Sequence, residues 1–300
     1  MVSVRYGPSE ALPEPSPRRW NARGVSCLVA ALLVLAPVVV GPGAGDALAQ
    51  PFSEVLIFAG CDSNIPITRR LARVFTQKHP EVRIELKAVG STNAIAMVAA
   101  GALHVGLVSR ALRDGENRPG STFVPYATTA VIIGAAPDTP DTGLSSAELL
   151  SMYRGTKLQW NSGREVAFLT REQGDSSVGS LGAALPGFAE AYAAGSRTSH
   201  WTVLYSEAAM HEALLTIPFA LGLSDLGTVI IERLPIRALA LDGVAPTPQN
   251  LVSGRYPLTM TLGFVWREDT LPAFARTFVE FVQSEEGAGI LRSYGYLPAP

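Results

Sequence analysis

Three short polar loops carry residue types that bind small anions. Each follows an apolar run and opens a helical pattern: Gly60-Cys61-Asp62-Ser63-Asn64, Gly90-Ser91-Thr92-Asn93, and Arg171-Glu172-Gln173-Gly174-Asp175-Ser176-Ser177. Backbone N–H groups at a helix N-terminus, together with the positive end of the helix dipole, attract anions. The same residue types are also the preferred N-caps, so a single loop is explained by capping alone. Three such loops together favour an oxyanion site.

Two arginines stand where they could complete such a site. Arg110 follows Ser109 at the end of the apolar run 105–108, and Arg171 follows the run 166–169. A guanidinium group at the mouth of the site can donate two parallel hydrogen bonds to an oxyanion. The alternative for each is a surface arginine that pairs with a nearby carboxylate, and position alone leaves both interpretations open.

The sequence lacks the motifs of common hydrolases and metalloenzymes. It contains no G-x-S-x-G elbow, no H-E-x-x-H pair and no Walker loop. The four histidines are scattered, and the two cysteines, Cys27 and Cys61, have no metal-binding spacing. A net charge of −2 provides no basic surface for nucleic acid. We therefore predict a protein that is not an enzyme and that needs no metal or other cofactor.

The first 49 residues predict an export signal. Arg18, Arg19 and Arg23 precede an apolar run over residues 25–40, and Ala47-Leu48-Ala49 fits a signal-peptidase site. The run is short for a membrane span, so we favour cleavage over a permanent anchor. Adjacent arginines leave twin-arginine export open. The remaining chain is expected to be soluble, in the periplasm or otherwise exported.

The rest of the chain alternates strand and helix patterns, which is typical of α/β architecture. Apolar runs at 55–59, 82–86 and 105–108 predict a β-α-β-α-β unit with a parallel sheet. Ser145 and Glu148 predict a capping box. Further strands are expected at 130–134, 166–169, 220–223 and 258–266, and further helices at 177–184, 188–194, 207–215, 272–283 and 286–293. Ligands of such folds gather at the carboxyl ends of strands, where the three loops lie.

Longer motifs run through most of the chain after the leading segment. Residues 90–95 read GSTNAI, 101–110 read GALHVGLVSR, 148–160 read ELLSMYRGTKLQW, 171–177 read REQGDSS, and 239–258 read LALDGVAPTPQNLVSGRYPL. In this order and spacing they resemble the phosphate-binding, PstS-type family of periplasmic solute-binding proteins. The resemblance implies a type II periplasmic-binding-protein fold, with two α/β lobes joined by two crossover strands that close on the ligand.

The resemblance also divides the chain and carries over candidate ligand-binding residues. Residues 50–126 and 240–300 would form lobe 1, and residues 127–239 would form lobe 2. Matched position by position, the candidates are Ser63, Ser91, Thr92, Ser109, Arg110, Arg171, Ser176 and Ser177. Asp62 and Asp175 join them as carboxylates where the family has hydroxyl-bearing residues, and His104 stands where the family has an aspartate.

The function implied is capture of an inorganic oxyanion, phosphate first, for an ABC permease in the inner membrane. In this family an acidic group accepts the proton of a monoprotonated oxyanion and repels a fully ionised one. Two carboxylates beside a dianion require such a proton, or pairing with an arginine. Molybdate, sulfate or an organic phosphate are alternatives, and so is a sensory or regulatory binding protein of the same fold. We expect a monomer.

Overall fold

The computed structural model describes residues 54–300, so the predicted signal peptide at residues 1–49 lies outside the described residues. The strands are β1 (Glu54–Gly60), β2 (Val82–Ala88), β3 (Val105–Val108), β4 (Ser121–Ala135), β5 (Gly143–Leu144), β6 (Ala167–Arg171), β7 (Trp201–Leu204), β8 (Ala220–Asp225), β9 (Arg237–Leu241), β10 (Thr259–Arg267) and β11 (Leu297–Pro298). The helices are η1 (Asp62–Asn64, a 3-10 turn), α1 (Ile65–Lys78), α2 (Ser91–Ala99), α3 (Ser146–Arg154), α4 (Ser176–Ala184), α5 (Phe188–Gly195), α6 (Glu207–Thr216), α7 (Leu226–Glu232), α8 (Pro248–Val252), α9 (Ala273–Gln283) and α10 (Glu285–Ser293).

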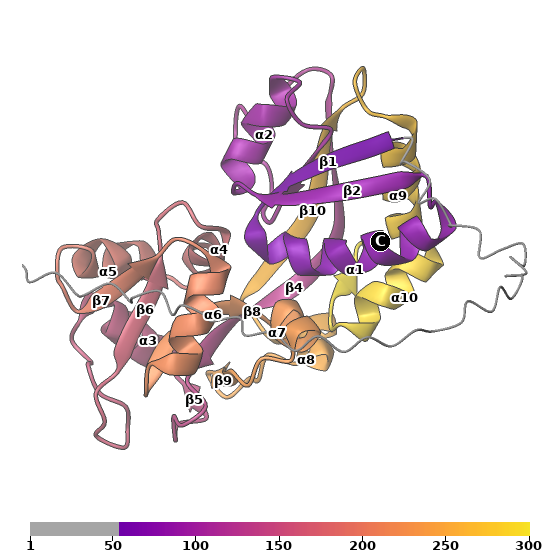
Figure 1. Cartoon of the computed structure of the whole chain (residues 1–300). Coiled ribbons are helices and arrows are strands. Elements are labelled where there is room, and N and C mark those ends of the chain that lie inside the picture. Colours follow the sequence, from indigo (N-terminus) through magenta and orange to yellow (C-terminus); the bar gives the residue numbers. More distant parts are fainter. Residues whose placement is uncertain (1–53) are drawn as a thin grey trace, which may run out of the picture. The chain divides into compact units, whose positions relative to one another are not determined.

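The sheet of lobe 1 has the strand order β2-β1-β3-β10-β4. β1 pairs in parallel with β2 and β3, whereas β10 runs antiparallel to β3 and β4. Side chains of a strand alternate between the faces of a sheet. Phe58 of β1 accordingly packs edge to face on Phe278 of α9, with 5.3 Å between ring centroids, while the neighbouring Ala59 packs with Ile95 of α2. Helices therefore cover both faces of this sheet (Figure 1).

The sheet of lobe 2 has the order β4-β8-β6-β7 and begins with the second half of β4. β6 runs parallel to β7 and β8, and β8 runs antiparallel to β4. Helices α3, α4, α5 and α6 belong to this lobe (Figure 1). Tyr153 of α3 lies edge to face against Phe168 of β6 and Phe188 of α5, with ring centroids 4.8 Å apart in both pairs. An aromatic cluster thus holds the helices to the sheet.

The long strand β4 crosses from one lobe to the other. Residues 121–130 pair with β10, and residues 131–135 pair with β8 and β9. The sequence predicts a strand at 130–134, and these residues do form a strand, but it begins earlier, at Ser121, because the hydrogen-bonded ladder is continuous through this point. Its first residues are only half buried and mixed in polarity, so they lack a clear strand pattern. The chain returns beside β4, where the Val131 N–H donates to the carbonyl of Leu258 at 2.8 Å.

The lobe boundary proposed between residues 126 and 127 falls inside β4, shortly before its partners change at Val131. Helix α7 packs against α1 and β4, so it contacts elements of both lobes at the junction. Within residues 54–300, none of the helices combines the length and the hydropathy that a membrane-spanning helix requires.

Candidate functional site

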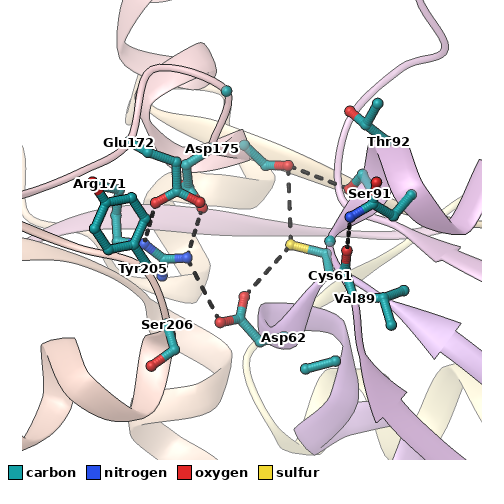
Figure 2. A pocket seen from close by; sticks show the side chains of 15 residues that line it. Cys61, Asp62, Val89, Ser91, Thr92, Arg171, Glu172, Asp175, Tyr205 and Ser206 are labelled. Atoms are coloured by element: carbon teal, nitrogen blue, oxygen red, sulfur yellow. Dashed lines mark hydrogen bonds and ion pairs between the residues drawn. The ribbon is translucent and has the colours of Figure 1, made fainter.

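A cavity of about 470 Å³ lies between the two lobes. Its walls come from the loops that follow β1 and β2 in lobe 1, and β6 and β7 in lobe 2. Figure 2 shows the lining residues, which are Cys61, Asp62, Ala88, Val89, Gly90, Ser91, Thr92, Asn93, Arg171, Glu172, Gly174, Asp175, Ser176, Tyr205 and Ser206. The carboxyl ends of parallel strands meet here, which is the usual place for a ligand in an α/β fold.

The N-terminus of α2 is open to this cavity. Its N-cap is Gly90, whose φ of 78° lies in the left-handed region that glycine adopts without strain. The Gly90 N–H donates to the carbonyl of Gly60 at 2.9 Å, which holds the loop against the end of β1. No side chain caps α2, and first-turn N–H groups have no partner within a helix. Ser91, Thr92 and Asn93 therefore bring the positive end of the helix dipole to the cavity wall.

A chain of small polar side chains lies beneath this helix end. The Cys61 Sγ is 3.1 Å from the Ser63 Oγ, which donates to the Ser109 Oγ at 3.2 Å. The Ser109 N–H donates to the Ser91 Oγ at 3.1 Å, and the Ser91 Oγ lies 3.5 Å from the Ser176 Oγ of lobe 2. Burial raises the pKa of the Cys61 thiol to about 11, so this thiol is neutral at physiological pH. The chain connects the two lobes through hydroxyl groups.

Arg171 is the one cationic side chain among the described residues that line the cavity. Only 4% of its side chain is exposed, and three carboxylates surround it. Its Nη2 lies 3.1 Å from the Asp175 Oδ2 and 3.7 Å from the Asp62 Oδ2, and its Nε lies 3.5 Å from the Glu172 Oε2 (Figure 2). Burial opposes the charge, but Asp175, Asp62 and Glu207 outweigh it and raise the pKa of Arg171. The guanidinium is therefore permanently charged and outnumbered by carboxylates.

Two further helix N-termini at the cavity, those of α4 and α6, are occupied by side chains of the protein itself. Asp175 is the N-cap of α4, and it accepts hydrogen bonds from the Ser177 N–H at 2.8 Å and from the Ser177 hydroxyl. Ser206 is the N-cap of α6, and the Glu207 N–H next to it donates to the Asp62 Oδ2 at 2.7 Å. An anionic ligand therefore finds a free helix end at α2 alone among these three.

Arg110 lies outside the cavity lining. Its Nη1 and Nη2 donate to the two carboxylate oxygens of Glu116 at 2.7 and 2.8 Å, and its Nη2 also donates to the Thr92 Oγ1 at 3.1 Å. The hydrogen bonds from Arg110, together with its charge, lower the pKa of Glu116. Of the two interpretations open for Arg110, the structure shows the arginine paired with a carboxylate. Among the cavity-lining residues, Arg110 hydrogen-bonds to Thr92.

The ten candidate residues fall into three groups. Those that line the cavity are Asp62, Ser91, Thr92, Arg171, Asp175 and Ser176. Ser63 and Ser109 are buried beneath them in the hydroxyl chain, and Ser177 is buried against Asp175. Arg110 is paired with Glu116. The structure brings the three loops of the sequence analysis to one cavity, as the α/β pattern predicted.

A fourth loop at the cavity was missed from the sequence. It follows β7 and contains Tyr205, with 75% of its surface exposed, and Ser206. Strand β7 has only four residues, which are half buried or exposed. The sequence therefore shows no strand pattern there, and nothing marks the loop that follows as the end of a strand. The helix at 207–215 was predicted, and Ser206 immediately before it was the available signal, since serine is a preferred N-cap.

Behind the main cavity, a cluster of titratable side chains lies where α6 meets the junction. A smaller cavity of about 150 Å³ is lined by residues of both lobes, including Asp62, Glu207 and His211. The His211 Nε2 lies 3.2 Å from the Glu207 Oε2 and 2.8 Å from the Ser224 Oγ. Burial raises the pKa of Glu207, and it raises the pKa of the fully buried Asp225 to about 7. These groups hold protons in the folded protein more tightly than in water.

Comparison with known families decides what kind of protein this is. A family model described as a PBP superfamily domain matches residues 44–286. The chain belongs to the PBP superfamily.

Individual phosphate-binding proteins are similar to this chain over most of their length. The phosphate-binding protein PstS of Bacillus subtilis is 22% identical over 252 residues, which is 82% of this chain and 81% of that protein. A putative phosphate ABC transporter substrate-binding protein with bound phosphate, from Clostridium perfringens, has a TM-score of 0.75, with 22% identity, 82% of this chain and 100% of that chain covered. An ABC-type phosphate transport receptor from Vibrio cholerae has a TM-score of 0.61 at 22% identity, with 82% of this chain and 100% of that chain covered. The predicted fold, two α/β lobes with two crossovers, is confirmed.

Proposed function

We propose that this protein is an exported solute-binding protein that captures a phosphate-type oxyanion between its lobes and delivers it to an ABC importer. The observation that carries the proposal is the uncapped N-terminus of α2 in the inter-lobe cavity. N–H groups at such a helix end can bind an oxyanion without a full positive charge. The family members described above, which are named for phosphate binding, support the same choice of ligand.

The site residues take distinct roles in this proposal. The N–H groups of Ser91 and Thr92 and their hydroxyls bind the oxyanion from lobe 1, and Ser176 approaches it from lobe 2. Arg171 supplies positive charge from the floor of the cavity. A proton on the oxyanion can be donated to Asp62 or Asp175, which are acceptors when ionised. Ser63, Ser109 and Ser177 support these groups from beneath.

Binding rather than catalysis is the role that this chemistry favours. The buried hydroxyls hydrogen-bond to one another, and the histidine of this region, His211, bonds to Ser224 behind the cavity. The Cys61 thiol, with a pKa of about 11, is a poor nucleophile because the thiolate is the reactive form. Closure of two lobes around a bound ion creates the rigid surface that an importer can recognise.

Isothermal titration of the mature protein tests this proposal. The protein is unfolded and refolded to remove bound ligand, checked by circular dichroism, and titrated with phosphate, sulfate and molybdate at pH 6 and pH 8. We expect heat of binding with phosphate and little with sulfate, because sulfate has no proton to donate to Asp62 or Asp175. A folded protein that gives no heat with any of these oxyanions would remove the proposal.

A matched pair of variants tests where the oxyanion binds. Thr92→Asp places a carboxylate at the free end of α2. Ala273→Asp places the same charge at the first residue of α9, an exposed position outside the cavity. Loss of phosphate binding in the first variant and normal binding in the second would support the site at α2.

A further inference from the structure

The cavity has two ends of opposite electrostatic character. At the lobe 1 end, the uncapped N-terminus of α2 and the hydroxyls of Ser91 and Thr92 offer hydrogen-bond donors. At the lobe 2 end, Glu172 and Asp175 present carboxylates around Arg171 (Figure 2). The first end thus offers donors to an oxyanion, whereas the second end holds more carboxylates than cations.

The carboxylates exceed the positive charge available to them. Arg171 is shared between Asp62, Glu172 and Asp175, so three negative charges face one guanidinium. The contact to Glu172 is long, at 3.5 Å, and 38% of the Glu172 side chain is exposed. The excess negative charge is therefore accessible from the cavity, where a cationic group could pair with it.

The size of the cavity is not explained by widely separated lobes. The lobes already touch at its walls, through the Glu207 N–H and the Asp62 Oδ2 at 2.7 Å and through the Ser91 and Ser176 hydroxyls at 3.5 Å. The cavity still has a volume of about 470 Å³. Small-molecule sites begin at about 300 Å³, so this cavity has the size for an organic molecule.

An aromatic side chain lines the same cavity as the acidic end. Tyr205 is one of the lining residues, as are Arg171 and Glu172 (Figure 2). Three quarters of the Tyr205 surface is exposed, so the ring is available to a ligand. The face of an aromatic ring attracts an organic cation, and a carboxylate next to it adds to that attraction.

We propose that the ligand is a small zwitterion, a phosphonate or phosphate monoester that carries an ammonium group. This inference rests on the proposed oxyanion site and assigns the other end of the same cavity. The phosphonate accepts hydrogen bonds from the N-terminus of α2, Ser91 and Thr92. The ammonium group donates to Glu172 and Asp175 and lies against Tyr205. Each end of the ligand thereby meets the opposite charge.

Paired ligands that differ only in the amine test this inference. The titrations compare 2-aminoethylphosphonate with ethylphosphonate and 3-aminopropylphosphonate with propylphosphonate, with inorganic phosphate as a reference. We expect one of the amine-bearing ligands to bind about tenfold tighter than its partner without the amine, and tighter than phosphate. Raising the salt concentration should reduce the difference in affinity within each pair, because salt screens the partly exposed ion pair between the ammonium group and Glu172.

Charge-removing variants locate the ammonium group. Glu172→Gln and Asp175→Asn should each reduce the ratio of affinities within a pair. Because Glu172 has no role in the oxyanion site, ethylphosphonate binding should stay equal or tighten in Glu172→Gln. Asparagine is also a good N-cap, so Asp175→Asn keeps the cap of α4. Glu190→Gln removes an exposed carboxylate of α5 that does not line the cavity, and it should leave the ratio unchanged.

The outcomes separate the two proposals. If the amine gives no gain while phosphate and the alkylphosphonates bind, the zwitterion is excluded and the oxyanion site stands. If the gain appears but neither Glu172→Gln nor Asp175→Asn reduces it, the assignment of the acidic end is wrong. If none of these ligands binds to folded protein, both the oxyanion site and the zwitterion are overturned.

Discussion

The Asp62 carboxylate of lobe 1 accepts a hydrogen bond at 2.7 Å from the Glu207 N–H, at the first residue of α6 in lobe 2. The same Oδ2 lies 3.7 Å from the Arg171 Nη2, also in lobe 2. Asp62 was selected from the sequence as a ligand-binding candidate. Its contacts make it a bridge between the lobes as well as a wall of the cavity.

This bridge predicts different behaviour for two substitutions of Asp62. Asp62→Ala removes the acceptor, which should weaken the closed arrangement by about 1–3 kcal/mol and shift ligand-free protein toward an open one. Asp62→Asn keeps an oxygen acceptor and should stay closed. Small-angle X-ray scattering measures the radius of gyration, and an unchanged radius for Asp62→Ala would contradict the bridging role.

Replacing Arg171 should impair both oxyanion binding and folding stability. Arg171→Ala leaves carboxylates in the cavity without their cation, so oxyanion binding should weaken by more than about tenfold. Stability should fall by about 1–3 kcal/mol, less than for a fully buried pair because the cavity admits water. Arg171→Lys keeps the charge, so its oxyanion affinity and its stability should lie between those of wild type and Arg171→Ala. Calorimetry and urea unfolding measure these effects, and wild-type affinity in Arg171→Ala would remove Arg171 from the site.

A negative charge at the end of α2 should have opposite effects on binding and stability. Thr92→Asp is expected to stabilise the fold by about 0.3–1 kcal/mol, since an acidic side chain favours a helix N-terminus. The same carboxylate occupies the place of the anion, so phosphate affinity should fall by about tenfold or more. Ala273→Asp should stabilise without loss of binding. Equal phosphate affinity in Thr92→Asp and wild type would argue against the α2 site.

The buried Asp225 predicts a dependence of stability on pH. Asp225 is fully buried, its Oδ1 accepts from the Thr228 N–H at 2.8 Å, and burial raises its pKa from 3.8 to about 7. A raised pKa means that the folded state binds the proton more tightly, so this stability is present below about pH 4 and is lost as pH rises toward 7.

Asp225→Asn should therefore stabilise the protein at pH 8, by about 1–3 kcal/mol, with a much smaller effect at pH 4. Asparagine keeps the cap of α7 because it is also a preferred N-cap. Urea unfolding at both values of pH measures the difference, with the exposed Asp114→Asn as control. A gain of the same size at pH 4 and pH 8 would show that the charge of Asp225 is not its cause.

The Cys61 thiol should react slowly with alkylating agents. Its pKa of about 11 leaves about one thiolate in a thousand at pH 8, and the side chain is buried. In mature protein without Cys27, labelling by iodoacetamide should be much slower than in denatured protein. Asp62→Ala should accelerate it by opening the lobes. Equal labelling rates in folded and denatured protein would show that the thiol is exposed.

The repeating pattern of the sequence determined the α/β class and the position of its polar loops. Buried strands such as β3 read as continuous apolar runs, and the capping box of α3 forms as predicted from Ser145 and Glu148. Each signal is local, since it depends on residues within a few positions of one another. His104 is explained by the fold instead, because its Nδ1 accepts a hydrogen bond at 3.0 Å from the Ile57 N–H, 47 positions earlier in the chain.

Only the tertiary structure decided which helix ends are free and how charges are shared. Capping of α6 by Asp62 joins residues far apart in the chain, and pairing of Arg110 with Glu116 depends on how a loop folds back. Asp175 precedes α4 and caps its N-terminus. Thr92 lies in the first turn of α2, whose N-terminus has no side-chain cap. Electrostatic and hydrogen-bond partners are set by distances in space, and the order of residues along the chain does not specify those distances.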